Sequence, residues 1–464
     1  MSVVPLPVPG HATAKKQEPP GNLFDLYFRY MKETESPIVF HRWSLIAAVS
    51  AFLGRQFYLP FGTTRIFPNC YVMLIGNPGT RKSFAIKAAK RTLARAGYEH
   101  FSAEKTTKEK FLLDLEGLPE TYGDNHGNTG TTGSRRRGSN RAESIFANDV
   151  LASLDLGTND TPHDGVPREV FIAADEFNEF AGSGNLDFLS LLGSLWDWDD
   201  ELTTYKHRLK NSKSLSIYQP TIAILGGNTH TGFQEAFPVQ SIGQGFMSRL
   251  ILVHGEPSGR KISFPAKPPE YLEEELSRAF GAIKETVTGE AKMTDPARRA
   301  LDMIYRTWPE LEDYRFKHYS TRRFTHLLKL VLICAAIRYS TTIDMQDVLL
   351  ANTLLTYTES TMSKALGEFG KSKNSEAAQT IMTALYEAKA PMPFEALYKL
   401  VSRDVDKREI LVDILAGLQQ AGKIQPPDPH DKSKNKGFLP AQKPINSNAL
   451  YVDMKLLIEL RGNT

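Results

Sequence analysis

The segment that most constrains the fold is LIGNPGTRKSFAI, residues 74–86, in which an apolar strand passes through a glycine-proline-glycine turn into a helix. Gly76 and Gly79 allow the backbone to curl so that successive N–H groups converge on one point. The helix that follows directs the positive end of its dipole at the same point. Such an arrangement binds anions, and the spacing predicts a site for the phosphates of a nucleotide.

Side chains at the start of the helix would complete this site. Lys82 would reach the β and γ phosphates, and the Ser83 hydroxyl would coordinate Mg²⁺. The usual pattern is G-x-x-x-x-G-K-[ST], and Arg81 stands where its last glycine belongs. We expect the side chain to be tolerated because the chain is entering a helix there. The property that Arg81 would affect is the affinity for nucleotide. The alternative is a Gly-Pro turn before an ordinary helix start. The predicted nucleotide-contacting residues are Gly76, Asn77, Pro78, Gly79, Thr80, Arg81, Lys82, Ser83 and Phe84.

A second segment, REVFIAADEFNEF at residues 168–180, is a short apolar strand that ends in two carboxylates. Asp175 would hold the water shell of Mg²⁺, and Glu176 would orient and deprotonate an attacking water molecule. Glu179 is a competing base one helical step further on. Strands that end in Asp-Glu are common and are often ordinary exposed edges. This one lies about 90 residues after a predicted phosphate loop, and that combination favours a P-loop NTPase of the α/β class.

Residues 186–229 are expected to form a helix, a hairpin and a strand. Asn228 ends the strand and would hydrogen-bond the hydrolytic water or the γ-phosphate; the alternative is an asparagine in an ordinary turn. The hairpin is basic and would contact a nucleic-acid backbone, although short charged runs are also typical of solvated surfaces. The predicted DNA-binding residues are Lys206, Arg208, Lys210 and Lys213.

Arg249 immediately precedes another apolar strand, in GQGFMSRLILVHGE at residues 243–256. An arginine in this position could point across a subunit boundary at a neighbour's γ-phosphate, where it would stabilise the charge of the transition state. The alternative is a surface salt bridge.

Taken in order, these motifs resemble the core of AAA+-type ATPases. Within that group, PNCYVMLIGNPGTRKS, DEF, QPTIAILGGNT and GFMSR are similar to the ATPases found with phage, prophage and plasmid replication genes, related to MCM-like and superfamily 3 helicases. The resemblance covers residues 43–256. The resemblance implies a hexameric ring with ATP and Mg²⁺ between subunits. The hairpin corresponds by position only to a pore hairpin.

The flanking regions are expected to be helical. Residues 23–55 are predicted as an N-terminal helical collar, residues 56–262 as the ATPase core, and residues 263–370 as a helical lid. By similarity to MCM-type ATPases, Arg323 is expected to contact the γ-phosphate as a second sensor, although Arg322 and Arg323 are equally typical of surface charges. Residues 371–464 are predicted to form a winged helix that binds DNA or protein, with Lys432, Lys434 and Lys436 on its wing.

Composition restricts the remaining possibilities. The 464 residues suffice for two or three domains, 41% are hydrophobic, and the longest apolar runs are too short to span a bilayer. Cys70 and Cys334 lie in apolar surroundings and predict buried thiols in a reducing cytoplasm. Residues 1–22 are predicted as a Pro-rich disordered tail and residues 121–141 as a mobile insertion, with nucleic-acid contact as a weaker alternative for the insertion.

The sequence therefore predicts an oligomeric, ATP-driven DNA helicase or translocase of phage or mobile-element replication. No primase constellation is evident, so a separate primase is an expected partner. One alternative is an ATP-switched replication initiator or regulator that recognises an origin. Another is a helicase loader or remodelling ATPase that acts on proteins.

Overall fold

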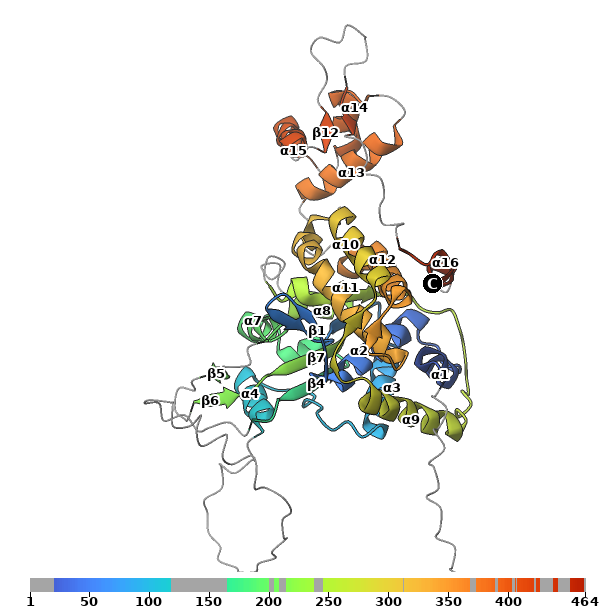
Figure 1. Cartoon of the computed structure of the whole chain (residues 1–464). Coiled ribbons are helices and arrows are strands. Elements are labelled where there is room, and N and C mark those ends of the chain that lie inside the picture. The colour runs from blue at the N-terminus through green and yellow to red at the C-terminus, as the bar shows by residue number, and fades with distance from the viewer. Residues whose placement is uncertain are drawn as a thin grey trace, which may run out of the picture.

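A computed structural model of the chain is shown in Figure 1. It describes residues 21–117, 165–199, 204–207, 214–237, 245–311, 313–367, 373–388, 391–402, 405, 407–420, 423–425, 437–440 and 451–462. The predicted insertion at residues 121–141 and nearly all of the predicted tail lie outside these ranges.

The centre of the molecule is a four-stranded parallel sheet with the order β4-β7-β3-β8. Its strands are β3 (Tyr71–Ile75), β4 (Glu169–Ala174), β7 (Thr221–Asn228) and β8 (Leu250–His254). β3 and β7 are buried along their whole length, which explains why both are continuous apolar runs. Because the strands are parallel, their carboxyl ends meet at one edge. The α/β class and these four strands are confirmed.

Helices cover both faces of the sheet (Figure 1). Alternate side chains of a strand point to opposite faces, so Val72 and Leu74 enter one core while Met73 and Ile75 enter the other. The first core includes α1 (Leu23–Tyr30), α2 (Ile38–Leu53) and α3 (Lys82–Arg95). The second includes α4 (Lys108–Glu116), α6 (Phe177–Ala181), α7 (Leu186–Ser194) and α8 (His230–Ala236). The protein is therefore a three-layer α/β structure.

The predicted N-terminal collar is wrong for α2. This helix packs against α3 and against β7, and its side chains are buried around its whole circumference. A helix that is apolar on every side is a core helix. We conclude that α2 is part of the central layer structure, and that the boundary predicted at residue 55 divides a single core.

The region predicted as a lid is helical but not separate. It contains α9 (Glu270–Thr286), α10 (Asp295–Thr307), α11 (Lys317–Ile337) and α12 (Met345–Leu366). α12 packs on α11 and β8, and apolar side chains of all four helices belong to the same core as α2. These helices are thus continuous with the sheet domain. Short strands and turns complete the region: β1 (Phe57–Phe61), β2 (Thr64–Ile66), β9 (Gly289–Glu290), β10 (Lys292–Met293), β11 (Thr342–Ile343), η2 (Met247–Arg249) and η3 (Tyr314–Phe316).

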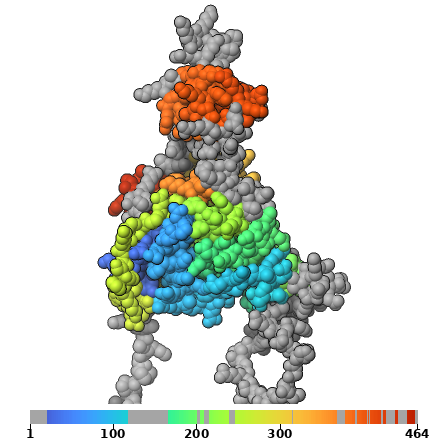
Figure 2. Space-filling view, turned by 180° about the vertical axis from the view of Figure 1, so that it is seen from behind, coloured from blue at the N-terminus to red at the C-terminus, as the bar shows by residue number. Residues whose placement is uncertain are grey.

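A small C-terminal unit stands at one end of the molecule (Figures 1 and 2). It consists of α13 (Lys373–Glu387), α14 (Phe394–Val401), α15 (Arg408–Gln420) and the antiparallel pair β12 (Ile424–Gln425) and β13 (Leu439–Pro440). A bridge between Met392 and Phe438 adds a third extended segment. The apolar side chains of the unit form a core of their own. Lys432, Lys434 and Lys436 lie outside the described residues.

The last helix, α16 (Met454–Gly462), belongs to the main body rather than to this unit. Leu457 and Leu460 are buried in the first core, and the Asp453 N–H donates to Thr353 Oγ1 of α12 at 2.9 Å. The predicted C-terminal boundary is therefore wrong. The sequence of this nine-residue helix does not indicate that it packs on α12, about 100 residues earlier in the chain.

Two expectations from composition can be compared with the structure. Cys70 and Cys334 are buried free thiols, as predicted. Among the helices that the structure describes, none combines the length and apolar character that crossing a membrane requires.

Candidate active site

The glycine-rich loop joins β3 to α3 and turns tightly against the end of β8. A Cβ atom added to Gly76 would lie 2.5 Å from the carbonyl oxygen of Gly255, so only glycine fits there. Gly79 has φ +85°, a conformation that glycine adopts without steric cost. The Thr80 hydroxyl donates to the Asn77 carbonyl at 2.8 Å and closes the turn. The loop thus has the curled backbone that the spacing predicts.

Arg81 is the N-cap residue of α3 and has φ 60° and ψ 30°. The prediction that it lies at the helix start is confirmed. Its backbone is nevertheless left-handed, which costs a residue with a Cβ atom about 1–2 kcal/mol relative to the right-handed form. The structure therefore explains why the usual pattern has glycine at this position.

Lys82 bends back over the loop. Its Nζ donates to Gly76 O at 2.9 Å, to Asn77 O at 3.2 Å and to Thr80 Oγ1 at 3.2 Å. Burial lowers the pKa of Lys82, and the charge of Glu176 acts in the opposite direction. These three acceptors are uncharged, so an anion in the loop would be a stronger partner for the ammonium group than any of them.

Glu176 follows β4 and lines the same pocket as Lys82. Its pKa is raised, mainly by burial; Lys82 opposes this shift, while Glu179 and Asp175 reinforce it. A carboxylate whose pKa is raised towards neutrality is a better general base than an exposed one. The neighbouring Asp175 instead forms an ion pair with Lys87 of α3, at 2.7 Å.

Asn228 ends β7 between the other two predicted motifs. It is fully buried, and its Nδ2 lies 3.7 Å from the Met73 sulfur, a weak acceptor. Its Oδ1 accepts from the Asn178 N–H at 3.4 Å. Thr229, the next residue, lines the pocket. The strand position is as predicted, while the amide itself lies behind the pocket wall.

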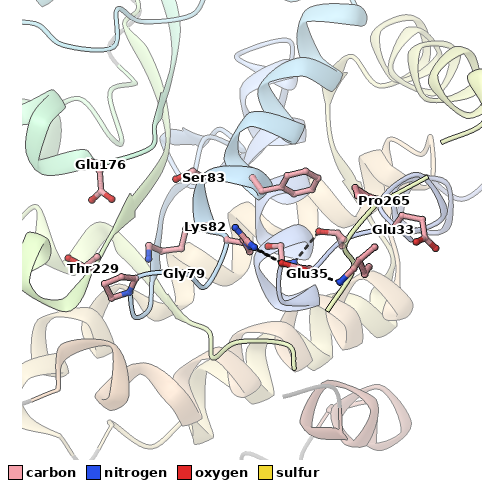
Figure 3. Close-up of a pocket in the computed structure, with 14 residues that line it drawn as sticks. Glu33, Glu35, Gly79, Lys82, Ser83, Glu176, Thr229 and Pro265 are labelled. Atoms are coloured by element: carbon pink, nitrogen blue, oxygen red, sulfur yellow. Dashed lines mark hydrogen bonds and ion pairs between the residues drawn. The ribbon is translucent and has the colours of Figure 1, made fainter. Parts of the chain in front are cut away.

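The pocket has a volume of about 580 Å³. Figure 3 shows Glu176 and Thr229 on one side of Lys82, and Glu33, Glu35 and Pro265 on the other. The lining residues are Glu33, Thr34, Glu35, Ser36, Pro78, Gly79, Arg81, Lys82, Ser83, Phe84, Glu176, Thr229, Ile262 and Pro265. This volume falls within the range of small-molecule sites, roughly 300–1,000 Å³.

One wall of this pocket is not predictable from the sequence motifs. The residues of the α1–α2 loop and of the segment after β8 are distant from the phosphate loop in sequence and match no motif. The Arg81–Glu35 ion pair that joins this wall to the phosphate loop has no signal in the sequence.

The metal ligands predicted here are few. Ser83 lines the pocket, and Asp175 lies at the tip of β4. Within the described ranges there is no group of three or more His, Cys, Asp or Glu side chains suited to a metal ion. A Mg²⁺ ion at this site would therefore take most of its oxygen ligands from phosphates and water, as Mg²⁺ commonly does.

Arg249 lies at the opposite edge of the sheet. Leu250 pairs with Tyr71 at the start of β3, whereas His254 pairs with Ile75 beside the phosphate loop. Since a strand rises about 3.3 Å per residue, Arg249 is roughly 15 Å or more from the loop of its own chain. The arginine therefore lies too far away to serve the pocket of the same subunit.

The Arg249 guanidinium shares a carboxylate with Arg322. Arg249 Nη2 lies 3.7 Å from one oxygen of Asp197, and Arg322 Nη1 lies 3.5 Å from the other. Both guanidinium groups lie within 6 Å of the Trp196 ring centre, at 5.8 and 5.9 Å. Burial lowers the pKa of Arg249, and the charge of Arg322 lowers it further. Two guanidinium groups thus share the Asp197 carboxylate.

The sensor role predicted for Arg323 is wrong. Its side chain is 2% exposed, its Nε donates to Glu359 at 3.0 Å, and its Nη2 donates to Asn352 at 2.7 Å. The guanidinium also stacks 3.3 Å from the centre of the Trp308 ring. Arg323 is thus a structural group inside the helical layer, and its neighbour Arg322 is the more exposed arginine of the two.

Replacing Arg323 with methionine is expected to lower the free energy of unfolding by about 3–5 kcal/mol, because Glu359 would remain buried without its cation. Urea unfolding at neutral pH measures this change. Arg322→Met is the matched control, and a change below about 1 kcal/mol is expected for its partly exposed ion pair. Equal effects of the two substitutions would contradict the structural role of Arg323.

The basic hairpin is described in part. β5 (Tyr205–His207) pairs with β6 (Leu215–Ile217) in antiparallel fashion, as predicted, and Lys206 is exposed on β5. Arg208, Lys210 and Lys213 lie outside the described residues. β6 leads into the start of β7, so the hairpin emerges at the sheet edge opposite the phosphate loop.

Neither the scan against protein-family models nor the search of curated proteins found a match to this chain.

Proposed function

We propose that this chain is a P-loop ATPase that uses ATP hydrolysis to move along DNA. The observation that carries the proposal is that Lys82, Glu176 and Thr229, which follow three neighbouring parallel strands, line one pocket together. Ligands of open parallel sheets bind beyond the carboxyl ends of the strands, where these residues lie. A cation facing a carboxylate of raised pKa is the pairing that phosphate binding and water activation require.

Each group has a role in this proposal. The loop N–H groups and Lys82 bind the phosphates, and Glu176 orients and deprotonates the attacking water. Ser83 and Asp175 would hold Mg²⁺, and the ion would neutralise negative charge on the phosphates. To donate to the water or to the γ-phosphate, the buried Asn228 amide would have to turn from its weak contact with Met73 towards the pocket.

The site is completed in this proposal by a second copy of the chain. Arg249 is too far from its own pocket, and it shares the Asp197 carboxylate with Arg322, so a neighbour's γ-phosphate would offer it a further anionic partner. A ring places that edge against the next subunit's pocket, as the resemblance to AAA+ ATPases implies. An arginine supplied in this way accelerates hydrolysis by about 10³–10⁵-fold.

Mixing Arg249→Ala subunits with Lys82→Ala subunits is therefore expected to restore ATPase activity that neither variant has alone. In a random 1:1 ring, recovery is about one quarter of the wild-type rate, because half of the sites are intact and half of those face an intact arginine. Steady-state hydrolysis measures the recovery, and differently tagged subunits verify co-assembly. Background activity in verified mixed rings would contradict the trans role.

Two features support DNA as the track. The β5–β6 hairpin carries the basic run KHRLKNSK, which suits a phosphate backbone. The C-terminal unit has the element order of a winged helix, three helices with a small sheet, and this module binds either DNA or protein. A separate primase remains the expected partner in replication.

Unwinding of forked DNA tests the motor. We expect ATP-dependent strand displacement that Lys82→Ala abolishes. Lys206→Ala is expected to reduce stimulation of the ATPase by DNA while DNA-independent hydrolysis stays near the wild-type rate. ATP-dependent protection of one DNA sequence without displacement would instead favour the replication initiator. Hydrolysis stimulated by a partner protein and insensitive to DNA would favour the loader.

A further inference from the structure

Arg81 is the residue of the phosphate loop that departs from the usual pattern. It adopts a left-handed backbone conformation in which a glycine would be unstrained. Strained residues concentrate at functional sites, where the surrounding structure holds them in place. We therefore expect the side chain of Arg81 to have a function in the pocket.

The Arg81 guanidinium is held by Glu35 from the loop between α1 and α2. Its Nε and Nη2 donate to Glu35 Oε2 at 2.9 and 2.6 Å. The side chain of Arg81 is 58% exposed and that of Glu35 is 25% exposed. An ion pair this accessible to water contributes little to stability, so it can be exchanged at small cost.

Glu35 has a second partner that does not depend on Arg81. Its Oε1 accepts from the Ile262 N–H at 2.9 Å. This hydrogen bond, together with Arg81, holds the pKa of Glu35 below its ordinary value, so the carboxylate is ionised at neutral pH. Arg81 can thus leave while Glu35 keeps its hydrogen bond to the backbone.

Arg81, Glu35 and Lys82 all line the same pocket. Glu35 and Pro265 lie on the side of Lys82 away from Glu176 (Figure 3). If Glu176 faces the reacting phosphate, the Glu35 side faces the part of the nucleotide that does not react. Arg81, which is paired with Glu35 on this side, would then lie within reach of the inner phosphates.

We propose that Arg81 is a ligand of the non-reacting phosphates of the nucleotide and that Glu35 competes with them for its guanidinium. The inference rests on the proposed function, because it requires that the pocket binds a nucleoside polyphosphate. A guanidinium forms forked hydrogen bonds to phosphate, and several phosphate oxygens offer more negative charge than one carboxylate. The affinity of the site is then set by the balance between these two partners.

The test is the binding of ADP and ATP to full-length protein, measured by isothermal titration calorimetry. Arg81→Gln is expected to raise the dissociation constants of both nucleotides about tenfold, since it removes charge-assisted hydrogen bonds. The kcat for ATP is expected to stay within about threefold, because a contact made equally before and during reaction changes binding alone. Arg81→Lys keeps the positive charge but loses the forked guanidinium geometry. Its dissociation constants are expected to lie between those of the wild type and of Arg81→Gln.

Glu35→Gln is expected to change nucleotide affinity in the opposite direction from Arg81→Gln. Removing the competing charge is expected to lower both dissociation constants by about threefold or more, and the double variant should bind like Arg81→Gln alone, because Glu35 acts through Arg81. Arg260→Gln is the matched control. Arg260 Nη1 donates to Lys32 O of the same α1–α2 loop at 2.9 Å, but Arg260 is not among the residues that line the pocket.

The outcomes separate this inference from the proposed function. Wild-type affinity in Arg81→Gln, or weaker binding in Glu35→Gln, would overturn the inference even where Lys82→Ala fails to bind. If the wild-type chain binds neither nucleotide, the proposed function fails and the inference falls with it. Opposite shifts for Arg81→Gln and Glu35→Gln, with Arg260→Gln unchanged, support it.

Discussion

Replacing Glu176 with glutamine is expected to lower the rate of ATP hydrolysis by about 10²–10⁴-fold while ATP still binds. The substitution keeps the size of the side chain and removes its ability to accept a proton. Because Glu176 lines the pocket opposite Lys82, its loss affects the chemical step rather than the phosphate contacts. Single-turnover hydrolysis and equilibrium binding, measured on the same preparation, separate the two effects.

The matched control is Glu179→Gln. Glu179 lies on α6, one helical step from Glu176, and its charge raises the pKa of Glu176. A severe loss of hydrolysis in this variant together with normal turnover in Glu176→Gln would transfer the role of base to Glu179.

The pKa of Glu176 also predicts a pH dependence. The pKa is raised, so the protonated, inactive form persists to a higher pH than for an exposed glutamate. We expect kcat/KM, which reports the free enzyme, to fall as the pH is lowered through this raised value, and the fall should begin above the ordinary titration range of a glutamate. Glu176→Gln is expected to lack this acidic limb.

Replacing Lys82 with alanine is expected to weaken ATP and ADP binding by at least about 100-fold and to abolish hydrolysis. The Lys82 ammonium group is directed into the loop. Two backbone carbonyls and one hydroxyl of the loop accept its hydrogen bonds. Its removal takes the point charge from the centre of the anion site. Calorimetric titration measures the loss of binding, and circular dichroism verifies the fold.

Lys90→Ala provides the comparison on the same helix. Lys90 forms an ion pair with Glu104 at 2.6 Å and does not line the pocket. Near-normal nucleotide affinity is expected for this variant. Equal affinity in Lys82→Ala and Lys90→Ala would contradict the assignment of the pocket as a phosphate site.

The sheet and its motifs were predictable because their signals are local. β3 and β7 are mainly apolar runs. The phosphate loop directly follows β3, Asn228 ends β7, and Asp175 and Glu176 directly follow β4. In a parallel sheet, such residues meet at one edge whatever the strand order. The order itself, with β7 between β3 and β4, has no comparable signal.

Contacts between segments far apart in the chain have no local signal in the sequence. α2 was separated from the core because its apolar residues do not show which layer they enter, and α16 packs on a helix about 100 residues earlier. Arg322 and Arg323 are adjacent and chemically identical, but only Arg323 faces Glu359 inside the helical layer. The contact between Glu35 and Arg81 likewise joins two loops that no motif connects.

The most direct test of the account is steady-state ATP hydrolysis by the wild-type chain, with and without single-stranded DNA, beside Lys82→Ala. We expect turnover that DNA stimulates and that the Lys82 variant lacks in both conditions. Turnover that persists in Lys82→Ala, or no turnover by the wild-type chain in either condition, would contradict the claim that this pocket hydrolyses ATP.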